Sequence, residues 1–175
     1  MSILLALMPI CGLWAEVREI TAGSGTSTTY NSPFCNYYNH GANQIVYAGK
    51  ELNASGKISA IAFDVATASE YTPTSIKIYM GHKASGAFAD NADFVPLTDL
   101  TLVYSGAPTL GKEVGWEKYV LDKPFDFDGS NLVVAIEKHA NNYVGALTYN
   151  ATNVTGSVLY RQNDNNSKYG DFDQS

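Results

Sequence analysis

The stretches ISAIAFDV at residues 58–65 and SIKIYM at residues 75–80 alternate between large apolar side chains and smaller or polar ones. Successive side chains of a β-strand point to opposite faces, so this alternation predicts two strands that each bury one face. The predicted inward faces carry Ile61, Phe63 and Val65 in the first stretch and Ile76, Ile78 and Met80 in the second.

Similar patterns recur along the chain, with residues between them that favour tight turns. The further strand candidates are VREIT (17–21), QIVYA (44–48), TLVYSG (101–106), WEKYVLD (116–122), NLVVAIEK (131–138), YVGALTY (143–149) and SVLYRQ (157–162). No long helical pattern separates them, which argues against a parallel α/β fold. The sequence therefore predicts an all-β fold, a two-sheet antiparallel β-sandwich of jelly-roll-like architecture with about nine strands. Residues 81–99 are expected to form an ordered excursion over the sandwich with one helical turn at most.

The length and net charge of the chain indicate a single domain that does not bind nucleic acid. A chain of 175 residues is long enough for one domain with a substantial core. The formal net charge is −6, and the 11 Lys and Arg residues are scattered along the chain. Phosphate binding needs a basic patch, so nucleic acid is excluded as the expected partner.

The first fifteen residues, MSILLALMPICGLWA, are uncharged and form an apolar run too short to span a bilayer. This pattern is typical of a signal peptide that lacks its positive n-region, with cleavage after Ala15. It places a single domain at residues 16–175, truncated at its C-terminus, and a location that is secreted or on the bacterial cell surface, associated with the outer membrane. The mature chain would not be transmembrane. The alternatives are a buried strand and a lipid-modified Cys11.

Cys35 and His40 lie close enough in sequence to suggest a nucleophile or a metal site. No recognised catalytic pattern surrounds Cys35, and His82 and His139 have no paired spacing with His40. We therefore predict that Cys35 is a packed core residue. The chain also lacks a nucleophile elbow, a phosphate-binding loop and a zinc-protease helix, so no catalytic residues are predicted.

Carboxylates could still form a catalytic pair across a groove, as in glycoside hydrolases built on sandwiches. Asp64 and Glu137 are expected to face outward on their strands and to be solvated. One local cluster stands out: FDFDGSN at 125–131 offers oxygens from Asp126, Asp128 and Asn131 to a calcium ion. The alternative is a hairpin that uses Asp-Gly for its turn geometry.

Aromatic residues are the remaining candidates for binding. Exposed rings at strand ends can stack on a sugar or anchor a protein partner. Of the rings placed at strand ends or in loops, Tyr37, Tyr38 and Trp116 are the predicted ligand-binding residues; Tyr71, Tyr143 and Tyr169 share such positions.

Five segments together resemble a known family: SGTSTTYNSPFCNYYNHGANQIVYAGKEL (24–52), GKISAIAFDVA (56–66), IKIYMGHK (76–83), LVYSGAP (102–108) and GWEKYVLDKPFDFDGSNLVVAIE (115–137). They are similar to repeat modules of bacterial surface proteins, akin to the cleaved-adhesin (haemagglutinin) jelly-roll domains of gingipains. The resemblance runs from about Glu19 to Asp171. It implies a non-catalytic jelly roll with a role in adhesion or carbohydrate binding, and calcium sites in some relatives.

The leading hypothesis is a non-catalytic, exported binding or adhesion module of a bacterial surface protein. Its partner would be a glycan or an extracellular protein, and the domain would be monomeric or part of a longer multidomain chain. The alternatives are a fragment of a polysaccharide hydrolase on the same sandwich and a structural spacer domain.

Overall fold

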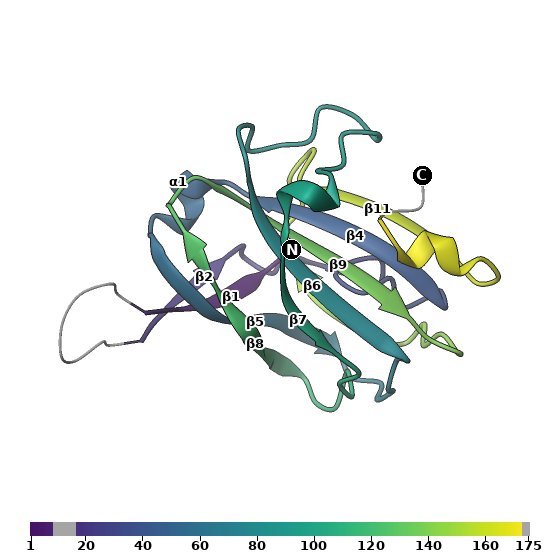
Figure 1. Cartoon of the computed structure of the whole chain (residues 1–175). Helices are drawn as coiled ribbons and strands as arrows, with labels where there is room; N and C mark the ends of the chain where they lie inside the picture. Colours follow the sequence, from purple (N-terminus) through teal and green to yellow (C-terminus); the bar gives the residue numbers. More distant parts are fainter. Residues whose placement is uncertain (9–16, 173–175) are drawn as a thin grey trace.

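A computed structural model describes residues 1–8 and 17–172 of the chain and contains two antiparallel β-sheets packed face to face (Figure 1). Sheet A consists of β1 (Ile3–Met8), β2 (Arg18–Ala22), β3 (Ser27–Thr29), β5 (Gly56–Thr67), β8 (Gly115–Phe127) and β10 (Thr148–Ala151). Sheet B consists of β4 (His40–Tyr47), β6 (Ser75–Lys83), β7 (Thr101–Gly106), β9 (Asn131–His139) and β11 (Val158–Asn163). The predicted all-β, two-sheet antiparallel sandwich is confirmed.

The strand order identifies the edge strands of sheet B and the neighbours of β5 in sheet A. In sheet B the order is β11-β4-β9-β6-β7, so β11 and β7 lie at its two edges. In sheet A the long strand β5 pairs with β8 on one side and with β1 and β10 on the other. Strands β7 and β8, which follow each other in sequence, therefore belong to different sheets and lie at the same side of the sandwich.

The described part of the chain contains eleven strands, against about nine expected. All nine predicted strands are present, and β1 and β3 are additional. The stretch predicted at 143–149 was placed too early. Its strand, β10, begins at Thr148, and Val144 and Leu147 are linked by a turn hydrogen bond of 3.3 Å.

Helical structure is limited to short segments in the described residues: α1 (Gly49–Leu52) and the 3₁₀ turns η1 (Leu97–Asp99) and η2 (Ser167–Gly170). No helix there is both long enough and apolar enough to cross a membrane.

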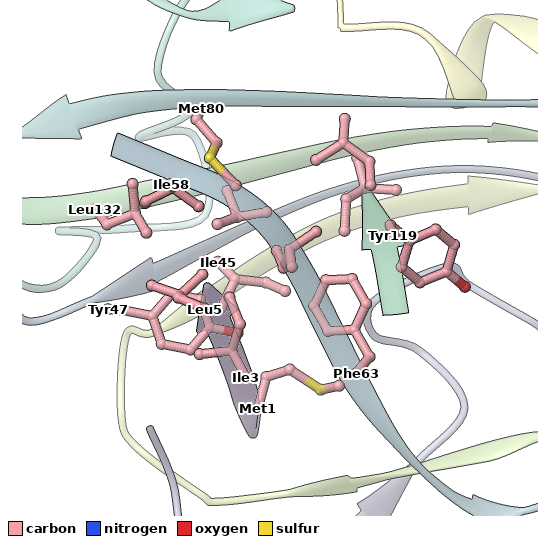
Figure 2. Packing of buried hydrophobic residues seen from close by; sticks show 14 of the residues in the cluster. Met1, Ile3, Leu5, Ile45, Tyr47, Ile58, Phe63, Met80, Tyr119 and Leu132 are labelled. Atoms are coloured by element: carbon pink, nitrogen blue, oxygen red, sulfur yellow. The ribbon is translucent and has the colours of Figure 1, made fainter. Parts of the chain in front are cut away.

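The main core lies between the sheets (Figure 2) and contains the predicted inward faces of β5 and β6. Phe63 is fully buried, and its ring meets Phe34 at 5.5 Å in an edge-on arrangement and Tyr119 at 6.1 Å. Edge-on and tilted ring pairs at such distances stabilise a core beyond the burial of apolar area. The alternation of apolar residues in the two decisive stretches therefore gave the correct faces.

Within the described residues 1–8, the apolar run at the start of the chain contains the buried strand β1, the alternative to a signal peptide. Strand β1 pairs with β2 on one side and with β5 on the other, with Leu5 opposite both Ile20 and Ile61. Ile3 and Leu5 are completely buried (Figure 2). The rest of the predicted signal, residues 9–15, including Cys11 and Ala15, lies outside the described residues, as does Glu16. Cleavage after Ala15 stays a prediction, but it would remove a central strand of sheet A.

A second, smaller cluster covers the outer face of sheet B. Residues 84–100 fold over this face and bury Phe88 and Val95 against Val46, Val133 and Leu159. The ordered excursion predicted at residues 81–99 is thus present with η1 as its helical turn, except that residues 81–83 belong to β6.

Glu137 lies under the chain's last described residues, and the expectation that it is solvated was wrong. Only 2% of Glu137 is exposed. Its carboxylate accepts hydrogen bonds from the Tyr79 hydroxyl at 3.0 Å and from the Phe172 N–H at 2.7 Å, and Lys77 Nζ lies 3.4 Å away. The C-terminal segment around Phe172 covers Glu137 and supplies a hydrogen-bond donor to it, which the alternation of residues within β9 cannot predict.

Candidate functional site

The loop between β3 and β4, residues 30–39, is held in place by buried polar side chains. Lys138 of β9 is fully buried, and its ammonium donates hydrogen bonds to the Cys35 carbonyl at 3.2 Å and to the Tyr38 carbonyl. Asn43 Nδ2 donates to the Asn31 carbonyl at 2.8 Å. Buried polar groups need such partners, so these contacts fix the backbone on both sides of Tyr37.

Asn36 joins this loop to the loop that precedes β10, residues 140–147. The side-chain amide of Asn36 donates to the Leu147 carbonyl at 3.2 Å. The backbone carbonyl of Asn36 accepts from the Val144 N–H at 2.9 Å. The Tyr71 hydroxyl donates to Asn36 Oδ1 at 3.0 Å. The two loops therefore form one braced unit at this end of the sandwich.

Cys35 has the surroundings of a packing residue. It is completely buried with a positive φ of 50°, and a Cβ added to Gly41 would lie 2.3 Å from Cys35 Cβ. Burial raises the pKa of the Cys35 thiol to about 11, against the partial effects of Asn43 and Lys138, so the thiol is neutral near pH 7. A neutral, enclosed thiol fits the predicted packing role.

His40 lies beside His139, a residue that is distant from it in the sequence. Its Nδ1 lies 3.1 Å from His139 Nδ1, and His139 Nε2 lies 3.0 Å from Asp171 Oδ1. Burial and the neighbouring His139 lower the pKa of His40. The sequence reasoning missed this pair because the two histidines are far apart in the chain and meet only through the pairing of β4 with β9.

Four tyrosines gather on the braced loops, and we call Tyr30, Tyr37, Tyr38 and Tyr143 the tyrosine surface. The Tyr37 ring lies 5.4 Å from those of Tyr30 and Tyr143 and 5.9 Å from that of Tyr38. Tyr37 and Tyr143 are 48% and 52% exposed. The ring of Tyr37 also lies directly over Gly145, where an added Cβ would come within 2.6 Å of it. The structure thus groups the predicted residues Tyr37 and Tyr38 and adds two that the sequence did not select together.

Trp116, the third predicted binding residue, lies on β8 and lines a separate cavity of about 550 Å³. The lining residues are Tyr104, Pro108, Thr109, Lys112, Glu113, Trp116, Glu117, Lys118, Tyr119 and Val120. None of them belongs to the tyrosine surface, so the structure places the three predicted aromatic residues at two different sites. Trp116 is 43% exposed.

The acidic turn has other partners for its three candidate calcium ligands. Asp126 pairs with Lys57 at 2.5 Å, and Asn131 Oδ1 accepts from the Gly49 N–H at 3.0 Å. Asp128 accepts from the Ser130 N–H at 2.8 Å and lies 3.2 Å from His82 Nε2. Gly129 has a φ of 91°, which suits the turn between β8 and β9. These contacts favour the hairpin over a cation site.

Within residues 1–8 and 17–172, no group of three or more His, Cys, Asp or Glu side chains is arranged to hold a metal ion. We therefore expect millimolar calcium to leave the melting temperature of the protein unchanged, because a ligand raises stability only if it binds the native state. Thermal unfolding with calcium and with EDTA is the measurement. A rise that EDTA reverses and that Asp128→Ala abolishes would show that the acidic turn binds the ion after all.

Comparisons with protein-family models, with curated proteins and with solved structures found no match for this chain.

Proposed function

We propose that this domain is a non-catalytic binding module of an exported bacterial surface protein and that it holds a glycan on the tyrosine surface. The observation that carries the proposal is the grouping of four tyrosine rings on two loops, where the Tyr37 ring contacts those of Tyr30, Tyr38 and Tyr143. The resemblance to cleaved-adhesin domains and the location at the cell surface are part of the same proposal.

Tyrosine suits this role because its ring offers an apolar face and its hydroxyl a hydrogen-bonding group. Sugar rings have a matching mixture of apolar C–H faces and hydroxyls. Large rings with few rotatable bonds also lose little conformational entropy on binding. In this domain Lys138 and Asn36 brace the loops beneath the rings, so the surface is organised before a ligand arrives.

Replacing Tyr37 with Ala should weaken glycan binding at least about tenfold, which corresponds to about 1.4 kcal/mol. Tyr37 is central, because its ring contacts the other three rings of the tyrosine surface. A glycan array would identify a ligand for the wild-type domain, and calorimetry would then compare the variants. Leu102→Ala is the matched control, because Leu102 is similarly exposed at 45% but lies on β7.

Other outcomes would separate the competing functions. A silent array together with tight binding to an extracellular protein, lost in Tyr37→Ala, would assign the tyrosine surface to protein adhesion. If the domain bound neither glycans nor extracellular proteins, a structural spacer would remain as its function. Equal loss of binding in Tyr37→Ala and Leu102→Ala would remove the tyrosine surface from the explanation.

A further inference from the structure

The cavity beside Trp116 lies where the edge strands of the two sheets approach each other. Its walls come from β7, from β8 and from the loop between them, residues 107–114. A volume of about 550 Å³ is within the range of small-ligand sites. In the described part of the chain β8 pairs with β5 alone, so its other edge faces this hollow.

The loop that forms one wall is fixed to the body of the domain. Leu110 is completely buried and exchanges two backbone hydrogen bonds with Tyr71, of 2.8 and 3.1 Å. Gly111 follows with a φ of 65°, and a Cβ there would lie 2.8 Å from the Ser69 carbonyl oxygen. The Thr109 and Thr72 hydroxyls lie 3.0 Å apart. The cavity is therefore preformed and does not depend on closure of the loop.

Glu117 supplies a half-buried carboxylate to the cavity. Its Oε2 accepts hydrogen bonds from the Gly111 N–H at 3.2 Å and from the Tyr149 hydroxyl at 3.3 Å. Burial raises the pKa of Glu117, while these hydrogen bonds act in the opposite direction. The carboxylate is thus held at a defined position on the inward face of β8, whereas Trp116 lies on the outward face, and both residues line the cavity.

The charges around the cavity balance. Lys112 and Lys118 contribute two positive charges, and Glu113 and Glu117 contribute two negative ones. A cationic or anionic ligand would meet as many like charges as opposite ones, whereas a neutral ligand would avoid that repulsion. A neutral oligosaccharide, with one ring stacked on Trp116 and a further hydroxyl that donates to Glu117, satisfies the remaining groups on the two faces of β8.

We propose that the cavity between loop 107–114 and β8 is a second ligand site, which binds a neutral oligosaccharide through Trp116 and Glu117. It shares no residue with the tyrosine surface, so it stands whether or not that surface binds a glycan. With both sites occupied, the domain could hold two sugars of one polymer or of neighbouring chains, which would increase avidity.

The fluorescence of Trp116 can be used to measure ligand binding in this cavity. The chain has two tryptophans, and a Trp14→Phe background leaves Trp116 as the single indole. Neutral cello-, malto-, xylo- and manno-oligosaccharides would be titrated while the fluorescence of Trp116 is followed. At least one series is expected to shift the emission with saturation. Trp116→Ala and Glu117→Gln, tested by calorimetry, should weaken that binding at least about tenfold, or about 1.4 kcal/mol.

Val114→Ala is the matched control, because Val114 is 65% exposed on the same loop but does not line the cavity. It and Tyr37→Ala should leave the fluorescence titration unchanged. Melting temperatures would establish that each variant is folded, and Trp116→Ala keeps the test decisive if Glu117→Gln is unstable. No fluorescence change with any series would overturn the proposal. Preference for oligogalacturonate or chitosan oligomers would overturn the neutral ligand class, and release of shorter sugars would overturn a binding-only site.

Discussion

Replacing Leu5 with Asp should unfold the protein, whereas the same substitution at Leu4 should leave it folded. The two residues are neighbours in β1, but Leu5 is completely buried in the core and Leu4 is half-buried on the opposite face. The Leu5 substitution loses about 1.5–3 kcal/mol of apolar burial. It also buries a carboxylate without a partner, which costs several kcal/mol more. Such a sum is comparable with the whole stability of a domain, about 5–15 kcal/mol.

Circular dichroism and urea unfolding would measure the two variants, with Leu4→Asp as the matched control. A chain that starts at Val17 gives the stronger version of the test, because it lacks β1 and with it Met1, Ile3, Leu5 and Leu7 of the core. That chain should not form the native sandwich. Wild-type stability of either Leu5→Asp or the shortened chain would show that β1 is dispensable. Such a result would favour the signal peptide over the strand for residues 1–15.

Raising the pH beyond about 10 should destabilise the fold steeply, because four tyrosines would have to ionise where they are buried. Burial raises the pKa values of Tyr47, Tyr71, Tyr119 and Tyr149 above the ordinary value of 10.0. A folded-state pKa above the unfolded one favours the neutral folded form. The stabilisation is fully present below pH 10 and is lost as the pH rises toward the folded-state pKa values.

Two other buried groups, Cys35 and Lys138, change the stability of the fold in opposite directions as the pH rises. The pKa of Cys35 rises from 9.0 to about 11, so its contribution decreases above pH 9. Burial lowers the pKa of Lys138 from 10.5 to about 8, so the unfolded chain binds more protons between these values and stability increases with pH there. Because the two effects oppose each other, the main loss of stability is expected above pH 10.

Urea unfolding from about pH 7 to about pH 12 would measure this dependence. Tyr149→Phe keeps the buried ring and removes one ionising group, so its curve should be less steep above pH 10. Exposed Tyr160→Phe is the control and should follow the wild type. A free energy of unfolding that stays constant up to about pH 12 would contradict the assignment.

Much of the fold could be predicted because its strands carry their own signal. In β5 and β6 the large apolar residues recur at every second position, and the structure buries those faces. Strand β3 escaped prediction because Ser27–Thr29 is short and polar, and only its pairing with β10 defines it as a strand. Strand β1 is uniformly apolar, a pattern that fits a central strand and a targeting segment equally well.

The candidate sites were less accessible to sequence reasoning, because each depends on how loops pack against other parts of the fold. Tyr37 and Tyr38 could be selected as neighbouring rings, but Tyr143 joins them only through the contact between two loops. Glu117 shares its face of β8 with the buried residues Tyr119 and Leu121, so alternation identifies it only as an acid on an inward face. Its importance follows from the fold of loop 107–114 beside it, which local periodicity does not specify.

The position of β1 also sets the order in which the domain can be completed during synthesis. This strand leaves the ribosome before β5 and β10, yet it pairs with β5, and the Met1 amine reaches the Thr152 carbonyl at 3.3 Å. At translation rates of about 5–20 residues per second, β1 waits roughly 7–30 s for that last neighbour. Strands β2 and β5 emerge earlier, but the core around β1 is complete only when the later strands follow, and incompletely buried apolar surface favours chaperone binding to the nascent chain.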